Sequence, residues 1–422
     1  MEIDADIAET IVNPEAYADF DRVHDAFAKL RRDRPVGLAA PEGYDPFWVV
    51  TRYDDVKAVE MQSDVFHNGA RASTLTTQID DQKVKELTGG SPHLVRSLVQ
   101  MDAPDHPKYR KLTQTWFAMK NIKAREARIR ELARETVEGM LATGGACDFA
   151  EDVALRYPLR VIMEVMGVPD EDTPKMLKLT QELFGATDNE MNRDGGHEKG
   201  QELVTMLNEV VTEFFGYFTE LTEARRKEPR DDLATVIAQA EVDGAPLGPV
   251  EAMSYYVLVA TAGHDTTSGS TSSAGWALAE RPDVLAEVKA DPSLIPGLVE
   301  ESIRWETPVK HFMRTAMEDT EIGGQAVAEG DWLMLSYPSA NRDERAFHEP
   351  FRFDPARTEK QLAFGHGPHL CLGQHLAKLE MRILWEELLP RVSEMSLDGV
   401  PTRVASTFVS GPKRVPIRFK AA

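Results

Sequence analysis

The chain has 422 residues, 42% of them hydrophobic, and a formal net charge of −22 at neutral pH. Such an excess of negative charge argues against nucleic acid and against anionic membrane surfaces as partners. The only two cysteines, Cys147 and Cys371, lie far apart without a Cys-x-x-Cys pair, which argues against a disulfide framework or zinc site and fits a reducing cytosol.

The chain shows no linker, low-complexity tract or internal repeat, so we expect one domain spanning residues 1–422. Its first twenty residues are acidic and polar, unlike a signal peptide. No apolar run approaches the roughly 18 residues of a membrane span. We therefore expect a cytoplasmic protein that does not enter a membrane.

Helical spacing of apolar residues dominates the sequence. Residues 15–34 are predicted to be a helix and residues 47–51 a strand, with further candidate strands at 327–337 and 402–409. The predicted fold class is therefore mainly α with a small β-sheet region (α+β). Residues 67–100 have no clean periodicity and predict a long irregular connection, either functional or a passive surface loop.

The next segment is basic. His106 and Arg110 are four residues apart and would share one helix face, which suits an anionic ligand, although a solvated face would read the same. Residues 108–134 hold nine Lys/Arg and two Glu, a local charge of +7, which indicates an acidic partner or an ordinary solvated helix. Residues 170–228 predict two amphipathic helices with a break near 188–196.

A long helix is predicted from Pro249 to the residue before Pro282, roughly 45 Å in length. Between Glu251 and Glu280 its 28 residues carry one formal charge, Asp265. A helix that is apolar all round is buried, and a buried carboxylate needs a reason. The neighbouring glycine and threonines weaken the helix at this point. The alternatives are a catalytic acid and a polar kink without catalysis.

Cys371 lies in the sequence Phe-Gly-His-Gly-Pro-His-Leu-Cys-Leu-Gly, residues 364–373. The glycines and proline exclude helix or regular strand and leave room for a flat, bulky group against the backbone. A helical pattern begins just after the cysteine, where a helix N-terminus stabilises a thiolate. Cys371 is thus a candidate axial ligand for haem iron, the alternative being a buried structural thiol.

These motifs resemble those of the cytochrome P-450 family. Phe364, Gly367, His369, Cys371 and Gly373 match every fixed position of its haem loop, Phe-x-x-Gly-x-(His/Arg)-x-Cys-x-Gly. The segment 262–267 matches (Ala/Gly)-Gly-x-(Asp/Glu)-Thr-(Thr/Ser) in the long helix. Glu301 and Arg304 match the family's Glu-x-x-Arg pair, which Arg357 would close into a structural triad. The resemblance covers roughly residues 15–415, with every motif in order.

The resemblance implies a triangular single domain with a long central helix over haem b, bound as thiolate through Cys371. It implies that Phe364, His369 and Gly373 flank the haem, and that His106, Arg110 and Arg314 bind its propionates. Asp265 would be the acid and Thr266 the alcohol that deliver protons to bound dioxygen. The irregular connection at 67–100 would cap the pocket, and the helices of 170–228 would form a lid.

The implied function is a haem-thiolate monooxygenase of the soluble bacterial class, a monomer that receives electrons from an acidic iron–sulfur ferredoxin and its reductase. Residues 42–46, 335–343 and 373–380 resemble the terpineol-hydroxylating branch. We therefore expect a small apolar substrate, such as a monocyclic monoterpenoid or an alkyl-substituted aromatic. The pocket candidates, by position in the family pattern, are Leu258, Thr261, Ala262 and Phe408.

Three alternatives stay open. The first alternative is the same chemistry on a larger hydrophobic substrate, such as a steroid, a fatty acid or a polycyclic aromatic. A peroxide-using or isomerising haem-thiolate enzyme is a second alternative, and the Asp265–Thr266 pair argues against it. A haem-based gas sensor is a third, and it would usually carry a signalling domain, of which the sequence shows no sign.

Overall fold

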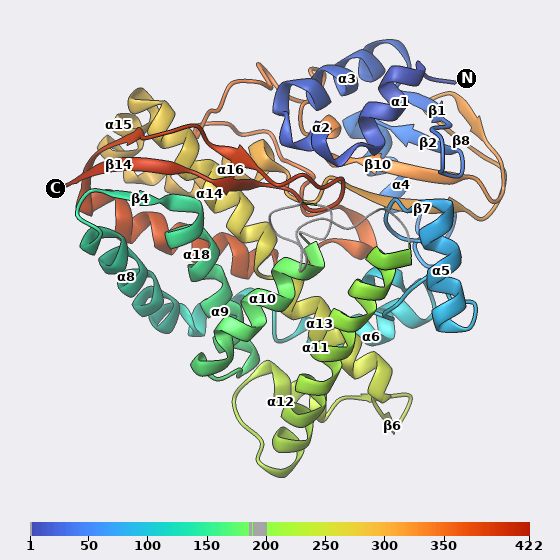
Figure 1. The fold of residues 1–422 in the computed structure, drawn as a ribbon, viewed down its shortest axis with the longest axis horizontal. Helices are drawn as coiled ribbons and strands as arrows, with labels where there is room; N and C mark the ends of the chain where they lie inside the picture. The colour runs from blue at the N-terminus through green and yellow to red at the C-terminus, as the bar shows by residue number, and fades with distance from the viewer. Residues whose placement is uncertain (1, 185–187, 189–200) are drawn as a thin grey trace.

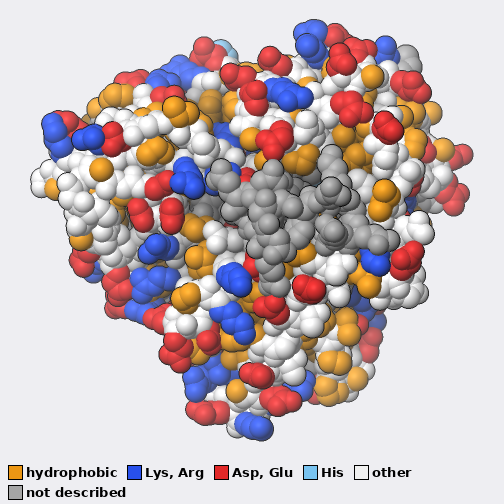
Figure 2. Space-filling model, viewed as in Figure 1, with side chains coloured by type: hydrophobic (Ala, Val, Ile, Leu, Met, Phe, Trp, Pro, Cys, Tyr) orange, Lys and Arg blue, Asp and Glu red, His pale blue; other side chains and the backbone are white. Residues whose placement is uncertain are grey.

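The structure, a computed structural model, describes residues 2–184, 188 and 201–422. Helices make up most of it, and most of the small sheets lie along one side of a roughly triangular outline, with α12 (Leu233–Ala238) and β6 (Ala245–Pro246) toward the opposite corner (Figure 1). The predicted class, mainly α with a small β region, is confirmed. Figure 2 shows acidic side chains spread over the visible face among clusters of Lys and Arg.

The α-helices follow one another along the chain as α1 (Ala5–Val12), α2 (Pro14–Ala18), α3 (Phe20–Asp33), α4 (Tyr53–Met61), α5 (Gln78–Thr88), α6 (Asp105–Gln114), α7 (Met119–Ala124), α8 (Glu126–Ala142), α9 (Arg156–Met166), α10 (Thr173–Phe184), α11 (Gln201–Lys227), α12 (Leu233–Ala238), α13 (Pro249–Ala262), α14 (Asp265–Glu280), α15 (Pro282–Ala290), α16 (Ile295–Glu306), α17 (Tyr337–Ala340) and α18 (Gln374–Leu388).

The strands are β1 (Val36–Ala39), β2 (Phe47–Val50), β3 (Phe66–His67), β4 (Ala146–Asp148), β5 (Glu241–Val242), β6 (Ala245–Pro246), β7 (His311–Ala316), β8 (Thr320–Ile322), β9 (Gln325–Val327), β10 (Trp332–Ser336), β11 (Val392–Leu397), β12 (Thr402–Arg403), β13 (Pro412–Arg414) and β14 (Pro416–Ala421). The largest sheet has the order β1-β2-β10-β7-β3, in which β10 is parallel to β2 and antiparallel to β7. A second sheet has the order β11-β14-β4.

Most predicted elements are found, with shifted boundaries. The helix expected at 15–34 is two helices, because Asp19 leaves the helical conformation and its side chain caps α3 at the N–H of Arg22. The strand at 47–51 is β2. The strand at 327–337 is divided by a turn at Gly330, whose φ is +87°. Of residues 402–409, only Thr402–Arg403 form a strand.

The expectation of an irregular connection at 67–100 is wrong for residues 78–88, which form α5. None of the residues of α5 is buried, so its sequence carries no apolar periodicity. The ends of the helix are nevertheless capped. The Thr77 hydroxyl accepts from the N–H of Asp80, and Gly89 ends the helix with a φ of +72°.

The long central helix is also divided, into α13 and α14, with Gly263 and His264 between them. The chain packs closely there. A Cβ atom on Gly263 would lie 2.7 Å from the side chain of Ile162 on α9. The Thr266 hydroxyl bonds back to the carbonyl of Ala262 at 2.9 Å, which is the backward bonding expected of helical threonines. The predicted weak point is therefore a complete break.

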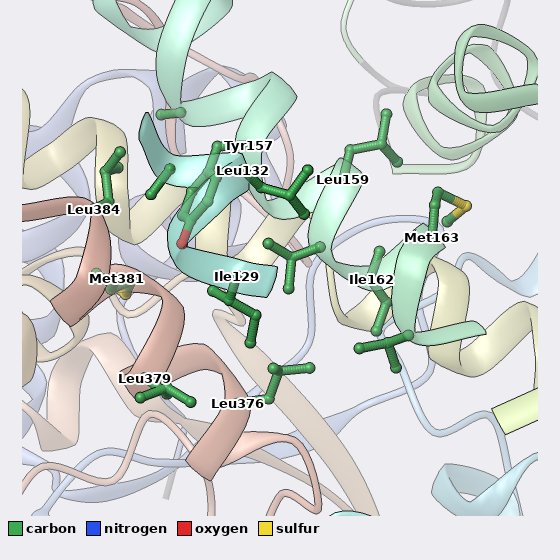
Figure 3. Packing of buried hydrophobic residues seen from close by; sticks show 14 of the residues in the cluster. Ile129, Leu132, Tyr157, Leu159, Ile162, Met163, Leu376, Leu379, Met381 and Leu384 are labelled. Carbon is green, nitrogen blue, oxygen red and sulfur yellow. The ribbon is translucent and has the colours of Figure 1, made fainter. Parts of the chain in front are cut away.

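The main apolar core fixes α18 against α8 and α9 (Figure 3). Its members include Ile129 and Leu132 from α8, Leu159, Ile162 and Met163 from α9, and Leu376, Leu379, Met381 and Leu384 from α18. Burying a side chain of this size contributes about 1.5–3 kcal/mol. Because α18 begins directly after the Cys371 loop, this core sets where the loop lies.

Candidate active site

A cavity of about 240 Å³ lies between the α13–α14 break and the Cys371 loop. The apolar part of its lining includes Leu98, Val99, Leu258, Val259, Ala262, Ile303, Val309, Phe312, Phe364 and Leu376. The polar part includes Glu60, Asn68, His106, Arg110, Thr266, Arg314, His369, Cys371 and Glu380. The cavity thus brings most of the predicted site residues together from four separate segments of the chain, at 106–110, 258–266, 314 and 364–373.

The Cys371 loop is held open by glycine. Gly365 and Gly367 have φ values of +70° and +66°, and a Cβ on Gly367 would come within 2.4 Å of the carbonyl oxygen of Glu60. The N–H of Cys371 donates to the carbonyl of Phe364 at 3.0 Å, which closes the loop. The other cysteine, Cys147, lies on β4, outside the cavity lining.

Burial raises the pKa of the Cys371 thiol, while N–H groups of Gly373 and Gln374 and the charge of Arg110 oppose the shift. The predicted helix N-terminus is therefore present, but in the protein alone burial outweighs it. A bound metal ion deprotonates a coordinating thiol outright, so iron would reverse the balance.

Cationic and imidazole groups gather beside the loop. The Arg110 guanidinium donates to the carbonyl of Leu370 at 2.5 Å, and Arg314 donates to the carbonyl of Met313 at 2.9 Å. The rings of His106 and His369 stack with centroids 3.9 Å apart. Burial lowers the pKa of His106 to about 4, and burial with His106 nearby lowers the pKa of His369 to about 2.

These groups fit a dianionic planar cofactor. Nε2 of His106 is buried and has no hydrogen-bond partner among the residues that the structure describes, so the site has an unused polar atom. Two arginines line the same cavity as a soft sulfur ligand and two glycines of the Cys371 loop, Gly365 and Gly373. Haem, with iron for the thiolate and two propionates for the cations, matches that donor set.

Asp265 and Thr266 lie at the start of α14, on the opposite side of the cavity. Thr266 is part of the lining, whereas Asp265 is not. The Asp265 side chain is 13% exposed, and one of its oxygens lies 3.4 Å from Nδ1 of His264. Its other oxygen is buried without a hydrogen-bond partner in the described part of the chain.

Glu380, on α18, is a site residue that the sequence analysis missed. It lines the cavity, is 1% exposed, and bonds through its side chain to Thr267. Burial raises its pKa well above the ordinary value, and the bond to Thr267 opposes that shift. A signal was present, because Glu380 shares the apolar helix face of Leu376 and Ile383 at i, i+4 and i+7 spacing.

Glu60, on α4, was missed as well, and no pattern in the sequence marks it. It is 5% exposed and accepts from the Tyr337 hydroxyl at 2.6 Å, with Arg314 3.8 Å away. Burial raises its pKa to about 7, against the opposing effects of Arg314 and Tyr337. Glu60 thus links α4 and α17 to the strand that carries Arg314.

The predicted substrate-pocket residues divide into two groups. Leu258 and Ala262 line the cavity. Thr261 and Phe408 are absent from the lining: the Thr261 hydroxyl bonds to the carbonyl of Val257 at 2.8 Å, and the Phe408 ring packs on Phe312 at 5.5 Å. Phe312, from β7, lines the cavity where Phe408 was expected to, and no spacing in the sequence marks Phe312 as a lining residue.

The Glu-x-x-Arg pair forms the predicted triad. Arg304 donates twice to Glu301, at 2.7 Å each, and Arg357 donates to the same carboxylate at 3.1 Å. All three side chains are at most 5% exposed. Arg304 also donates to the carbonyls of Asn341 and Pro350, so the triad fastens the segment that precedes the Cys371 loop.

The basic stretch at 108–134 is largely neutralised by acids from elsewhere. Lys108 pairs with Asp243, Arg125 with Asp231, and Arg130 and Arg134 with glutamates of α18. Lys111, Lys120 and Lys123 are exposed, and no ion pair involves them in the described part of the chain. Of the residues that give 108–134 its local charge of +7, these three lysines are the ones that remain available to an acidic partner protein.

No helix in the described ranges is long and apolar enough to cross a membrane. The break expected near 188–196 falls, except for Asp188, outside the described residues.

The comparisons with known proteins agree with this geometry. A family model described as Cytochrome P450 matches residues 41–417. "Cytochrome P450-terp" of Pseudomonas sp is 45% identical, over 99% of this chain and 98% of its own. "Linalool 8-monooxygenase" of Pseudomonas putida is 32% identical, over 96% and 97%. The crystal structure of CYP108D1 from Novosphingobium aromaticivorans DSM12444 superposes with a TM-score of 0.92 at 47% identity, covering both chains fully.

A family match of that extent also fixes the fold and the cofactor, since the family binds haem b through a cysteine thiolate. Of the two cysteines, Cys371 is the one that lies at the cavity. The chain therefore belongs to the cytochrome P450 family and is a cytochrome P450 monooxygenase whose haem b is bound through the thiolate of Cys371.

Proposed function

We propose that the whole chain, residues 1–422, acts as one monooxygenase domain that hydroxylates a small apolar substrate, such as a monocyclic monoterpenoid or an alkyl-substituted aromatic. The observation that carries the proposal is the apolar part of the lining that the cavity shares with Thr266, formed by Leu258, Val259, Ala262, Val309 and Phe312.

The relatives' names support this substrate class without deciding it. Linalool 8-monooxygenase is named for a small terpenoid alcohol, whereas a "Steroid C26-monooxygenase" of Rhodococcus jostii (strain RHA1), 33% identical, is named for a much larger substrate. The larger hydrophobic substrate is therefore the second candidate. Pocket side chains decide between the two, because relatives of one fold differ most there.

A binding screen tests the substrate class. Purified haem-loaded protein is titrated with small terpenes, alkylbenzenes, fatty acids and steroids while the Soret band is followed. We expect monocyclic terpenes or alkylbenzenes to give the tightest binding. Ala262→Phe should weaken that binding roughly 10-fold, because the larger side chain would occupy part of the cavity that the substrate needs. Thr261→Ser, next along the chain but outside the lining, is the matched control. Tightest binding of a steroid would overturn the proposal.

The site residues receive the following roles in the proposal. Haem, when bound, supplies the activation of dioxygen. Cys371 ligates its iron between Phe364 and Gly373, and Arg110, Arg314, His106 and His369 hold its propionates. Asp265 relays protons, and the Thr266 hydroxyl orients the water that carries them. The electron donor is an iron–sulfur ferredoxin, which the three unpaired lysines of α6 and α7 would contact.

Two variants separate the roles of the acid and the alcohol. Asp265→Asn keeps the side chain's shape but cannot ionise, so turnover should fall roughly 10²-fold while product still accounts for the oxygen used. Thr266→Ala should consume oxygen at nearly the wild-type rate but release peroxide in place of product. NADH use, peroxide and product are measured with one good substrate. Wild-type turnover and coupling in both variants would refute the assignment.

A further inference from the structure

His264 is the residue that joins α13 to α14, and its side chain is fully buried. Its ring contacts three polar atoms from three parts of the chain. Nε2 lies 2.9 Å from the carbonyl oxygen of Leu155, in the π-helical turn at Ala150–Leu155. Nδ1 lies 3.4 Å from the Thr180 hydroxyl on α10 and 3.4 Å from a carboxylate oxygen of Asp265.

These partners fix where the ring protons are. A carbonyl oxygen only accepts, so Nε2 of His264 must carry a proton. The Thr180 hydroxyl has a single proton and lies nearer to the carbonyl of Leu177, at 2.9 Å, than to Nδ1, at 3.4 Å. When it donates to that carbonyl it can only accept at Nδ1, and both neighbours of Nδ1, a hydroxyl oxygen and a carboxylate, are then acceptors. The contact between Nδ1 and Asp265 needs a proton that neither a neutral ring nor an ionised carboxylate supplies.

Charge leads to the same conclusion. The Asp265 carboxylate is largely buried, and its second oxygen has no hydrogen-bond partner among the described residues. No Lys or Arg of the described chain lies within ion-pair distance of it, and the contact with His264 is the ion pair that it forms. A buried carboxylate without a counter-charge is costly. His264 is thus the group that can neutralise it.

We infer that His264 and Asp265 hold one proton in common, which makes His264 a positioning residue and a proton store behind Asp265. The inference rests on the role proposed above for Asp265. In one form the imidazolium pairs with the carboxylate. In the other the proton has left Nδ1 and bonded to the Asp265 oxygen, the N–H electron pair stays on Nδ1, and both groups are neutral. The shift turns Asp265 into an acid without water entering the contact.

A second buried histidine provides a matched comparison within the same molecule. His311, on β7, is 1% exposed. Its Nδ1 lies 2.9 Å from the carbonyl of Thr407, while its Nε2 accepts from the N–H of Leu75 at 2.9 Å. One acceptor and one donor fix a neutral ring with a single N–H. Burial lowers the pKa of His311 to about 4, in agreement with that state.

The test is nitrogen NMR of histidine-labelled holoenzyme in its diamagnetic ferrous–carbon monoxide state at pH about 8, above the ordinary histidine pKa of about 6.5. We expect two protonated ring nitrogens for His264, or one proton exchanging between Nδ1 and the carboxylate, and one protonated nitrogen for His311. His264→Gln assigns the signals by removing them. Asp265→Asn should leave His264 with a single N–H, whereas Thr180→Val should leave its proton count unchanged.

Measuring the turnover of the same variants provides a second test. His264→Gln should slow product formation roughly 10-fold with an unchanged substrate KM and a larger solvent deuterium isotope effect, because the acid is then refilled only from solvent. A single N–H on wild-type His264 together with an ionised Asp265 carboxylate overturns the inference, whatever the turnover. Two ring protons with an unaffected rate in His264→Gln overturn the proton-store role. Wild-type turnover of Asp265→Asn instead refutes the proposed role of Asp265, and the spectrum still decides whether the pair shares a proton.

Discussion

Glu60 gives a prediction whose size follows from the structure. Burial raises its pKa from 4.5 to about 7, so from about pH 4.5 to about pH 7 the folded protein binds a proton that the unfolded chain has released. Stability therefore falls as the pH rises through this window, and the loss is complete above the folded-state pKa. At about 1.4 kcal/mol for each pKa unit, the loss amounts to about 3 kcal/mol.

Glu60→Gln removes the titration but keeps an oxygen that can accept from Tyr337. The free energy of unfolding of this variant, relative to wild type, should rise by about 3 kcal/mol between pH about 4.5 and pH about 8. The assay is urea unfolding of the haem-loaded protein, followed by circular dichroism at several pH values. Glu329→Gln, an exposed turn residue, controls for the loss of one negative charge. A difference between Glu60→Gln and wild type that does not change with pH would refute the reasoning.

Three further predictions concern other parts of the molecule. Reduced wild-type protein with carbon monoxide should absorb near ~450 nm, and Cys371→His should move the band to a shorter wavelength; an unmoved band would exclude Cys371 as the ligand. Lys123→Glu should slow electron transfer from an acidic ferredoxin at low salt and lose its effect at high salt, unlike Lys29→Glu on α3; equal rates at low salt would place docking elsewhere. Gly297→Ala should lower the urea midpoint, because its Cβ would lie 1.9 Å from the carbonyl oxygen of Pro355 and overpacking typically costs about 1–3 kcal/mol; an unchanged midpoint would contradict this close approach.

Local sequence was sufficient where the chain must adopt one unusual conformation. The glycines of the Cys371 loop predicted a backbone that is neither helix nor regular strand, and Gly365 and Gly367 do have positive φ, whereas the close approach of Gly367 to Glu60 is seen only in the structure. The same holds for the pair Glu301 and Arg304, which lie one helical turn apart on α16, whereas Arg357, which completes the triad, was expected only from the family resemblance. Such features depend on neighbours in the chain, so spacing reveals them.

Other features depend on partners far along the chain. The apparent +7 of residues 108–134 is reduced by pairing with Asp243, Asp231 and the glutamates of α18, more than a hundred residues away. Glu60 looks like any polar residue of an amphipathic helix until Tyr337 and Arg314 are seen against it. No window of the sequence contains both members of these pairs, so local pattern cannot predict them.

The broken central helix shows why its polar residues have separate tasks. The Thr266 hydroxyl donates its proton to the carbonyl of Ala262, so its oxygen meets the cavity as an acceptor and orients water without being the source of protons. Two carboxyls flank it, Asp265 and Glu380, the latter bonded to Thr267. Burial raises the pKa of Glu380, but at 1% exposure this carboxyl exchanges protons with solvent poorly. In the proposed mechanism each turnover consumes protons, so the acid must be reprotonated. Asp265 is 13% exposed and contacts His264, so we propose that it, rather than Glu380, is the carboxyl that is reprotonated.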